Sequence, residues 1–160
     1  MFFGKYIHTI DAKGRIIIPS ELRDTAIENA EKHKKRPVFY IMPGPGGCLY
    51  LFEETKFDEI VNKQFDLGLV APQNVTDLLR KFSSHAARRV CDAQGRIQVP
   101  EELITYSGLK KEIVFVGLVN RIEIWSSDSY HEKDSLSIVD FDKLAEELTK
   151  EKNKQEREGR

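Results

Sequence analysis

Short runs of β-branched and aromatic residues alternate along this chain with turns that contain glycine or proline. The runs Tyr6–Ile10 and Arg15–Ile18 flank a four-residue turn, which predicts a β-hairpin whose short loop ends in glycine. Continuous apolar runs at Val38–Met42 and Ile113–Val116 predict central strands that are covered on both faces. A glycine turn and a closing strand follow each of these two runs, at Leu49–Phe52 and Ile122–Trp125.

Short helices are expected directly after the first strands of each half. Pro19 and Pro100 lack the amide proton that a continuing strand would use, so each ends its strand and suits the first turn of a helix. These helices are predicted at Ser20–Asn29 and Glu101–Ser107.

Apolar residues at helical spacing predict two longer helices between the halves, Glu53–Phe65 and Asn74–Phe82, the second capped by Asn74. After Trp125 an amphipathic stripe continues, and the almost wholly charged end, Lys150–Arg160, is expected to fray. The stripe consists of Phe141, Leu144, Ala145 and Leu148.

The strongest pattern is an internal repeat. The segment Tyr6–Leu22 returns 81 positions later as Ala87–Leu103, and both copies contain Asp-x-x-Gly-Arg. A recurring unit of this kind completes its core against its twin, and two copies favour a pseudo-dimer over a solenoid. We therefore expect four segments: repeat domains at 5–52 and 83–126, a helical connection at 53–82, and a C-terminal helix with a charged tail at 127–160.

Composition narrows the class of protein. Halves of about 50 residues bury little apolar surface alone, so they are expected to pack tightly on each other. Cys48 and Cys91 cannot form a disulfide framework, and without a CxxC motif or clustered histidines we expect two buried, reduced thiols, no metal and no cofactor. No apolar run approaches the roughly 20 residues of a membrane span, and the start of the chain lacks signal-peptide features, so a cytoplasmic location is expected.

Charge is unevenly distributed although the formal net charge is only −1. The segment 80–96 is basic, with Asp92 as its single acidic residue, while residues 128–160 are rich in Asp and Glu. Basic groups gathered around the repeated motif are what a local anionic partner would require.

The repeated turn carries the candidate chemistry. Gly14 and Gly95 are expected at positive φ, and Asp11 and Asp92 are expected to accept hydrogen bonds from the amides of their own turns. Arg15 and Arg96 then emerge at fixed positions. Each arginine could simply pair with its aspartate, or it could bind phosphate or a guanine edge, because its planar fork suits both. A two-stranded ribbon is narrow enough to enter the major groove of DNA.

Further polar residues lie on the same predicted hairpins. His8 could point inward with Tyr6 and Ile10 or sit at the rim of the surface. The remaining candidates are Lys5 and Lys13 in the first copy, and Arg88, Arg89 and Gln94 in the second.

No catalytic constellation is present in the sequence, so an enzyme is not expected. The segment Gly44–Gly47 lacks the lysine and the helix start of a phosphate-binding loop and is interpreted as a connecting turn. The alternative to a DNA-binding protein is a protein-interaction module, because the same fold can serve as a dimerisation hub.

The motif set resembles the MraZ family. The resemblance runs from Met1 to about Tyr130, and it is carried by Tyr6-x-His8-Thr-x-Asp11-x-Lys-Gly-Arg15-x-x-x-Pro19, Ser84-His85-Ala86, Asp92-x-x-Gly-Arg96 and Arg121-x-Glu123-x-Trp125. Its two Asp-x-x-Gly-Arg units are similar to the SpoVT/AbrB-type DNA-binding domain.

The resemblance implies an α+β, β-rich fold: a pseudo-dimeric, swapped-hairpin (AbrB-like) β-barrel built from two internal repeats with short flanking helices. It also implies a nucleoid-associated bacterial transcriptional regulator, usually a repressor of the division and cell wall gene cluster, that assembles into rings and binds repeated boxes in its own promoter. Double-stranded DNA and further copies of the chain are the implied partners, with no membrane and no small-molecule substrate.

For individual residues, the resemblance makes Arg15 the principal DNA contact, with Lys13 and His8 beside it. Arg96 is expected either to contact DNA or to serve subunit packing. Phe3 stands where the family often has arginine, and Lys5 is a possible substitute for that basic group.

Overall fold

The computed structural model describes residues 1–29, 36–64 and 72–133, and in the C-terminal segment residues 143, 145–147, 149–151 and 154. It divides into two compact units, Met1–Ser127 and Asp128–Arg160. The first unit holds every strand described below.

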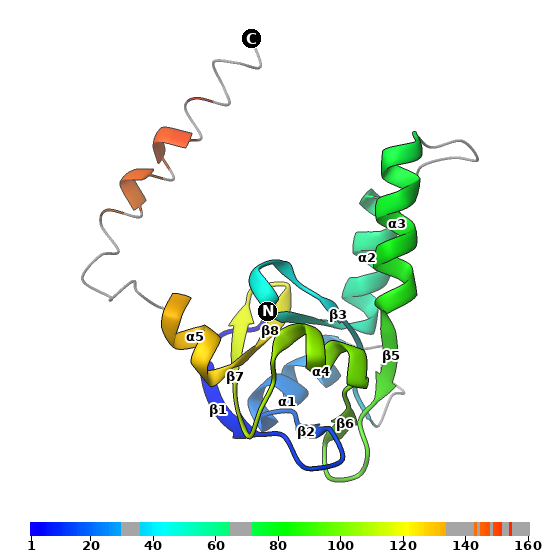
Figure 1. Cartoon of the computed structure of the whole chain (residues 1–160), viewed down its shortest axis with the longest axis vertical. Helices are drawn as coiled ribbons and strands as arrows, with labels where there is room; N and C mark the ends of the chain where they lie inside the picture. The colour runs from blue at the N-terminus through cyan, green and yellow to red at the C-terminus, as the bar shows by residue number, and fades with distance from the viewer. Residues whose placement is uncertain are drawn as a thin grey trace. The chain divides into compact units, whose positions relative to one another are not determined.

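Helices and strands follow one another in the same order in both repeats (Figure 1). The first repeat contains β1 Lys5–Thr9, β2 Arg15–Ile17, α1 Ser20–Asn29, β3 Val38–Pro43, the 3₁₀ turn η1 Pro45–Gly47, β4 Leu49–Glu53 and α2 Glu54–Gln64. After α3 Gln73–His85, the second repeat contains β5 Ala87–Val90, β6 Arg96–Gln98, α4 Glu101–Ser107, β7 Glu112–Leu118, β8 Arg121–Ser126 and α5 Ser127–Lys133.

The six-stranded sheet is woven from both repeats. Its strand order is β1-β7-β8-β4-β3-β5, and every neighbouring pair is antiparallel. Exchanging each strand for its counterpart in the other repeat turns this order into its own reverse. The sheet therefore has a pseudo-twofold relation through the central β4–β8 pair, where Leu49 pairs with Ile124 and Leu51 with Ile122.

The predicted local hairpin of Tyr6–Ile10 with Arg15–Ile18 is wrong as a strand pairing. β1 pairs with β7 of the second repeat, and β2 pairs with β6; only an isolated bridge, Ile10 to Ile16, links the two segments. The physical reason is burial: alternate residues of β1 lie against the second repeat, and Ile16 of β2 is fully buried in the shared core. Each repeat thus lends its first two strands to the other.

The fold is α+β with an antiparallel six-stranded sheet, and the α+β class is the one that the resemblance implies. β1 and β5 form the two edges of the six-stranded sheet, so within the described residues this sheet is open and a closed barrel is not confirmed. The two-stranded β2–β6 ribbon is separate from it, but both contribute to one apolar core, in which Ile16 and Ile97 of the ribbon join Phe39 and Phe115 of the sheet.

The helix predictions differ in accuracy. α1 and α4 occupy the predicted residues, and α2 and α3 lie within three residues of their predicted ends. Asn74 is not the N-cap of α3; the helix begins one residue earlier, Pro72 takes the cap position, and its carbonyl accepts bonds from the amides of Val75 and Thr76.

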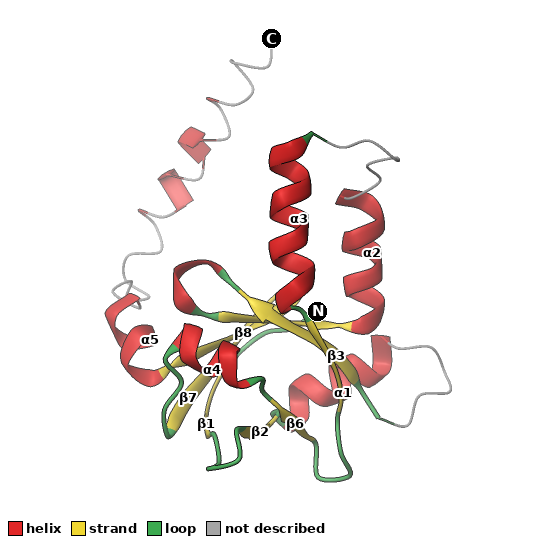
Figure 2. Ribbon diagram, turned by 45° about the vertical axis from the view of Figure 1, so that its right-hand side comes forward, coloured by secondary structure: helices red, strands yellow, loops and turns green. Residues whose placement is uncertain are grey.

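α2 and α3 run side by side and extend away from the ribbon (Figures 1 and 2). Phe57 of α2 stacks on Tyr40 of β3 with ring centres 4.1 Å apart, and Phe82 of α3 lies parallel to Phe57 at 6.2 Å. This aromatic stack fixes the helix pair to the sheet.

Several other expectations can be compared with the fold. Cys48 and Cys91 are both buried and unbridged, and burial raises the pKa of the Cys91 thiol to about 12, which keeps it protonated. Of the predicted C-terminal stripe, Phe141, Leu144 and Leu148 lie outside the described residues. Among the helices that the structure describes, none is long and apolar enough to cross a membrane.

Candidate nucleic-acid interface

The β2–β6 ribbon presents a polar outer face. Arg15 pairs with Gln98, and Ile17 pairs with Arg96, in antiparallel register. Directly paired residues share a face, so these four side chains lie together on one side of the ribbon. The middle pair, Ile16 with Ile97, points the other way and is buried. The ribbon is anchored in the core by one face and displays two arginines on the other.

The two turns that lead into the ribbon have the same geometry. Asp11 Oδ1 accepts hydrogen bonds from the amides of Lys13 and Arg15, both at 2.9 Å. Asp92 Oδ1 accepts the equivalent bonds from Gln94 and Arg96, also at 2.9 Å. The repeated motif therefore encodes a repeated turn, as the sequence predicts.

Each arginine is held by its aspartate. Arg15 Nε donates to Asp11 Oδ2 at 2.7 Å, and Arg96 Nε donates to Asp92 Oδ2 at the same distance. The arginine side chains remain 34% and 32% exposed. Ion pairing of this kind is one of the two roles expected for these arginines, and partial exposure leaves the second role, an external anion, open.

The turn amides shift the acidity of both aspartates. The backbone amide of Arg15 lowers the pKa of Asp11, with its guanidinium and the Lys13 amide adding to the effect against partial desolvation. Arg96 and Gln94 lower the pKa of Asp92 in the same way. Both carboxylates are therefore ionised at neutral pH and hold their arginines as charged acceptors.

Glycine is required at the end of each turn. Gly14 has φ +73° and Gly95 has φ +77°, which lie in the left-handed region that other residues avoid. Both sites are also crowded: a side chain at Gly14 would meet Ile104 and Gln98, and one at Gly95 would meet the guanidinium of Arg23.

The lesser candidates of the first copy lie in different environments. Lys13 is exposed on the first turn, and Lys5 is exposed on the edge strand β1. His8 takes the inward alternative: it is half-buried beside Tyr6 on the same face of β1, edge-on to Phe115 with ring centres 5.7 Å apart. Phe3 is 59% exposed.

Arg88 and Arg89 of β5 make contacts within the chain. Arg88 Nε donates to Glu54 Oε1 at 2.8 Å, and this contact raises the pKa of Arg88. Arg89 Nε donates to the carbonyl of Gln98 at 2.8 Å, which ties the edge strand to the ribbon. Gln94 lies on the second turn, with its Oε1 at 3.5 Å from an Nη of Arg96.

Sequence reasoning missed three basic residues near the turns. Lys110 and Lys111 line a hollow of about 490 Å³ together with Asp11 and Gly14. Arg23 of α1 lies against the second turn, beside Gly95. Comparing the repeats position by position could have singled out Arg23, because the equivalent residue of α4 is the apolar Ile104.

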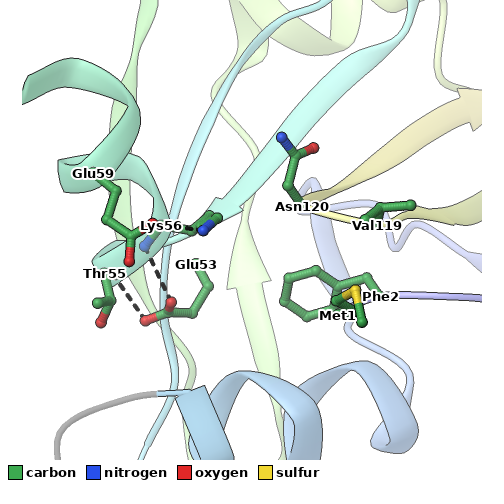
Figure 3. Close-up of a pocket in the computed structure, with 8 residues that line it drawn as sticks. All are labelled: Met1, Phe2, Glu53, Thr55, Lys56, Glu59, Val119 and Asn120. Atoms are coloured by element: carbon green, nitrogen blue, oxygen red, sulfur yellow. Dashed lines mark hydrogen bonds and ion pairs between the residues drawn. The ribbon is translucent and has the colours of Figure 1, made fainter. Parts of the chain in front are cut away.

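Another hollow, of about 400 Å³, lies between the N-terminus and α2 (Figure 3). Glu53 on its wall is only 3% exposed, and its carboxylate accepts hydrogen bonds from the amides of Thr55 and Lys56 (Figure 3). This carboxylate therefore serves the first turn of α2, where its charge also complements the helix dipole. The described residues contain no group of three potential metal ligands.

These observations define an internally duplicated protein whose repeats exchange strands. Each repeat contributes one turn and the arginine that follows it to a common ribbon. The chain belongs to the MraZ family. The family model described as "MraZ protein, putative antitoxin-like" matches residues 1–78 and again 82–158.

Similar proteins cover nearly the whole chain. One from Finegoldia magna is 35% identical over 148 residues, which is 92% of this chain and 96% of the relative. Relatives from Lachnoclostridium phytofermentans and Clostridium acetobutylicum are each 36% identical over 149 residues, covering 93% of this chain and 96% and 97% of theirs. All three are named Transcriptional regulator MraZ.

Proposed function

We propose that this chain is a sequence-specific DNA-binding transcription regulator whose contact surface is the outer face of the β2–β6 ribbon with its two turns. The observation that carries the proposal is the placement of Arg15 and Arg96, from two matched turns, on one exposed face. The names of the family relatives support the same function.

The ribbon geometry suits double-stranded DNA. Arg96 is the diagonal neighbour of Arg15 across the strand pair, a separation of roughly 7–8 Å between backbone positions. A two-stranded ribbon fits the major groove, where arginine binds guanine or a flanking phosphate through its fork. Because each aspartate holds Nε, the Nη groups of the fork are oriented before DNA arrives, which reduces the entropy lost on binding.

The other candidates have subordinate roles in this proposal. Lys13 and Gln94 lie on the turns themselves and would contact the phosphates flanking the arginines. Lys5 would contribute at the margin of the surface. His8, Arg88 and Arg89 act mainly by fixing β1 and β5, since each has a contact within the chain.

In the proposed function, the ribbon and the sheet together act as the swapped-hairpin barrel of the SpoVT/AbrB type, with domains at 5–52 and 83–126. Subunits assemble into a ring in the cytoplasm at the nucleoid. The ring represses the division and cell wall gene cluster, including the protein's own promoter, by engaging repeated boxes at once.

A protein-interaction module without specific DNA binding is the second candidate. The observation that favours it is the apolar exposure along the β1 edge, where Ile7 is 61% exposed and Phe3 is 59% exposed. The salt dependence of binding distinguishes the DNA-binding regulator from the protein-interaction module. DNA affinity falls steeply with salt as counterions are released, whereas an apolar interface responds weakly.

The test is binding of the wild type and Arg15→Ala to DNA from upstream of the gene, with random DNA as control, across a salt series. We expect specific, salt-sensitive binding that Arg15→Ala abolishes without a change in oligomer size. A folded oligomer with no preference over random DNA would exclude the regulator and favour the interaction module.

A further inference from the structure

The two ends of the ribbon differ in the residues that line them. Positions 81 apart are equivalent in the repeats, so Lys13 of the first turn corresponds to Gln94 of the second. The first turn therefore carries a lysine that the second turn lacks. Without another cation at the second turn, the two ends of this pseudo-symmetric surface would differ in their affinity for an anion.

Arg23 of the other repeat lies on the second turn, beside Gly95, the residue that follows Gln94. A Cβ built on Gly95 would lie 2.5 Å from Cζ of Arg23, so the guanidinium rests directly on the turn. At the other end of the ribbon, the equivalent space over Gly14 is filled by Ile104 and Gln98, each with an atom 2.9 Å from such a Cβ. Each turn is thus covered by a helix of the other repeat, but only one of the two helices provides a cation.

The position of Arg23 is fixed at the ribbon end. Its Nε donates to the carbonyl of Ile18 at 2.9 Å, and the amide of Ile18 donates to the carbonyl of Gly95 at 3.0 Å. This guanidinium makes no other hydrogen bond or ion pair with a described residue, and the side chain is partly exposed. The Nη groups are therefore available for a ligand while Nε keeps the group in place.

We propose that Arg23 is the phosphate-binding cation of the second turn and replaces, from the other repeat, the lysine that Gln94 does not provide. With it, the second turn has a further cation, Arg23, beside Arg96 and Asp92, as the first turn has Lys13 beside Arg15 and Asp11. The ligand is a DNA backbone phosphate, and the inference rests on the proposed function.

The test uses Arg23→Gln, which keeps a donor for the Ile18 carbonyl but removes the charge, with Arg23→Met as a second neutral variant. The full chain binds DNA from upstream of the gene across a salt series. The plot of log affinity against log salt has a negative slope. Each lost phosphate contact reduces the magnitude of that slope by about 0.9 and weakens binding about five-fold at 0.15 M salt.

A rescue variant separates charge from structure. Arg23→Gln combined with Gln94→Lys places the missing cation on the turn itself, as in the first repeat, and should restore the slope and affinity. Arg80→Gln is the matched control: it removes the same charge from a 66% exposed arginine on α3 and should leave the slope unchanged. Thermal unfolding and oligomer size are measured for every variant.

The outcomes distinguish this inference from the proposed function. If the wild type binds specifically but Arg23→Gln keeps the wild-type slope, or the rescue fails in a folded protein, Arg23 is not a phosphate contact. Loss of folding in both neutral variants would assign Arg23 to the fold alone and would equally overturn the inference. If the wild type shows no preference for the upstream DNA, the proposed function itself fails.

Discussion

Asp11 and Asp92 organise the ribbon turns at the scale of single residues. Each carboxylate accepts hydrogen bonds from two backbone amides and one guanidinium, so one ionised group fixes both the turn and the arginine that follows it. Removing the charge should loosen turn and arginine together.

Acid should reveal this role. The folded-state pKa of Asp11 lies below its ordinary value of 3.8, so the carboxylate's contribution to stability is complete above that value and is lost as pH falls through the lower folded value. We expect the unfolding free energy of the wild type to drop in this range, and Asp11→Asn to show a flatter acid dependence. Chemical denaturation at a series of pH values measures this free energy. Parallel curves of unfolding free energy against pH for the two proteins would contradict the prediction.

Gly14 should be intolerant of a side chain for two separable reasons. Gly14→Ala imposes the left-handed penalty of about 1–2 kcal/mol and also places a Cβ 2.9 Å from Ile104 Cδ1. Gly108→Ala is the matched control, because Gly108 has φ +59° but open space around its Cβ position. Urea unfolding should show the larger loss for Gly14→Ala; equal losses would mean that Ile104 yields without cost.

At the scale of elements, strand exchange makes the repeats dependent on each other. Among the residues that the structure describes, the only extended pairing within one repeat is β3 with β4, or β7 with β8. Every other ladder, including the ribbon, joins one repeat to the other. A lone two-stranded pairing is marginal in water, so one repeat lacks a stable sheet of its own.

Cutting the chain within residues 65–71 tests this dependence. Neither fragment should unfold cooperatively as a monomer, because each would expose the apolar faces that the other covers. Mixing the fragments in equal amounts should restore a 1:1 complex with a cooperative transition. Circular dichroism melts and sedimentation measure both properties, and a stable monomeric fragment would refute the dependence.

At the scale of the whole molecule, the small net charge of −1 limits the affinity that a single ribbon can reach for DNA. Linking several weak contacts in one assembly raises the effective concentration of each further contact. The proposed ring is the arrangement that would use this effect.

DNA fragments of equal length with one box or several boxes test multivalency. The wild type should bind the fragment with several correctly spaced boxes far more tightly, by a factor of about 10² or more. Changing the spacing by half a helical turn should remove most of the gain, because neighbouring subunits then face opposite sides of the duplex. Equal affinity for one and several boxes would rule out the multivalent part of the function.

The sequence predicts the local parts of this structure well. The duplication, the bounds of α1 and α4, and the positive φ of Gly14 and Gly95 follow from residues that are neighbours in the chain. Backbone conformation at such sites depends on the residue type and its immediate contacts, so the pattern is sufficient. The capping of α3 was predicted wrongly, because the helix begins at Gln73 and Pro72, not Asn74, takes the cap position.

The motif also predicted most of the residues of the candidate site, but not which residues from other elements lie beside them. Arg15, Arg96 and their aspartates follow from the motif, whereas Arg23, Lys110 and Lys111 come to the turns from other elements. Their proximity depends on how α1 and the segment before β7 pack, which no local pattern records.

Sequence alone thus determined the repeated units and the conformation of each turn. Only the tertiary structure decided which strands pair, because β1 has the same alternating pattern whether it lies beside β2 or β7. The pairing with β7 prevails because it contributes to a single core in which the ribbon residues Ile16 and Ile97 are buried with the sheet. Burial of shared apolar surface, summed over both repeats, is a property of the whole fold.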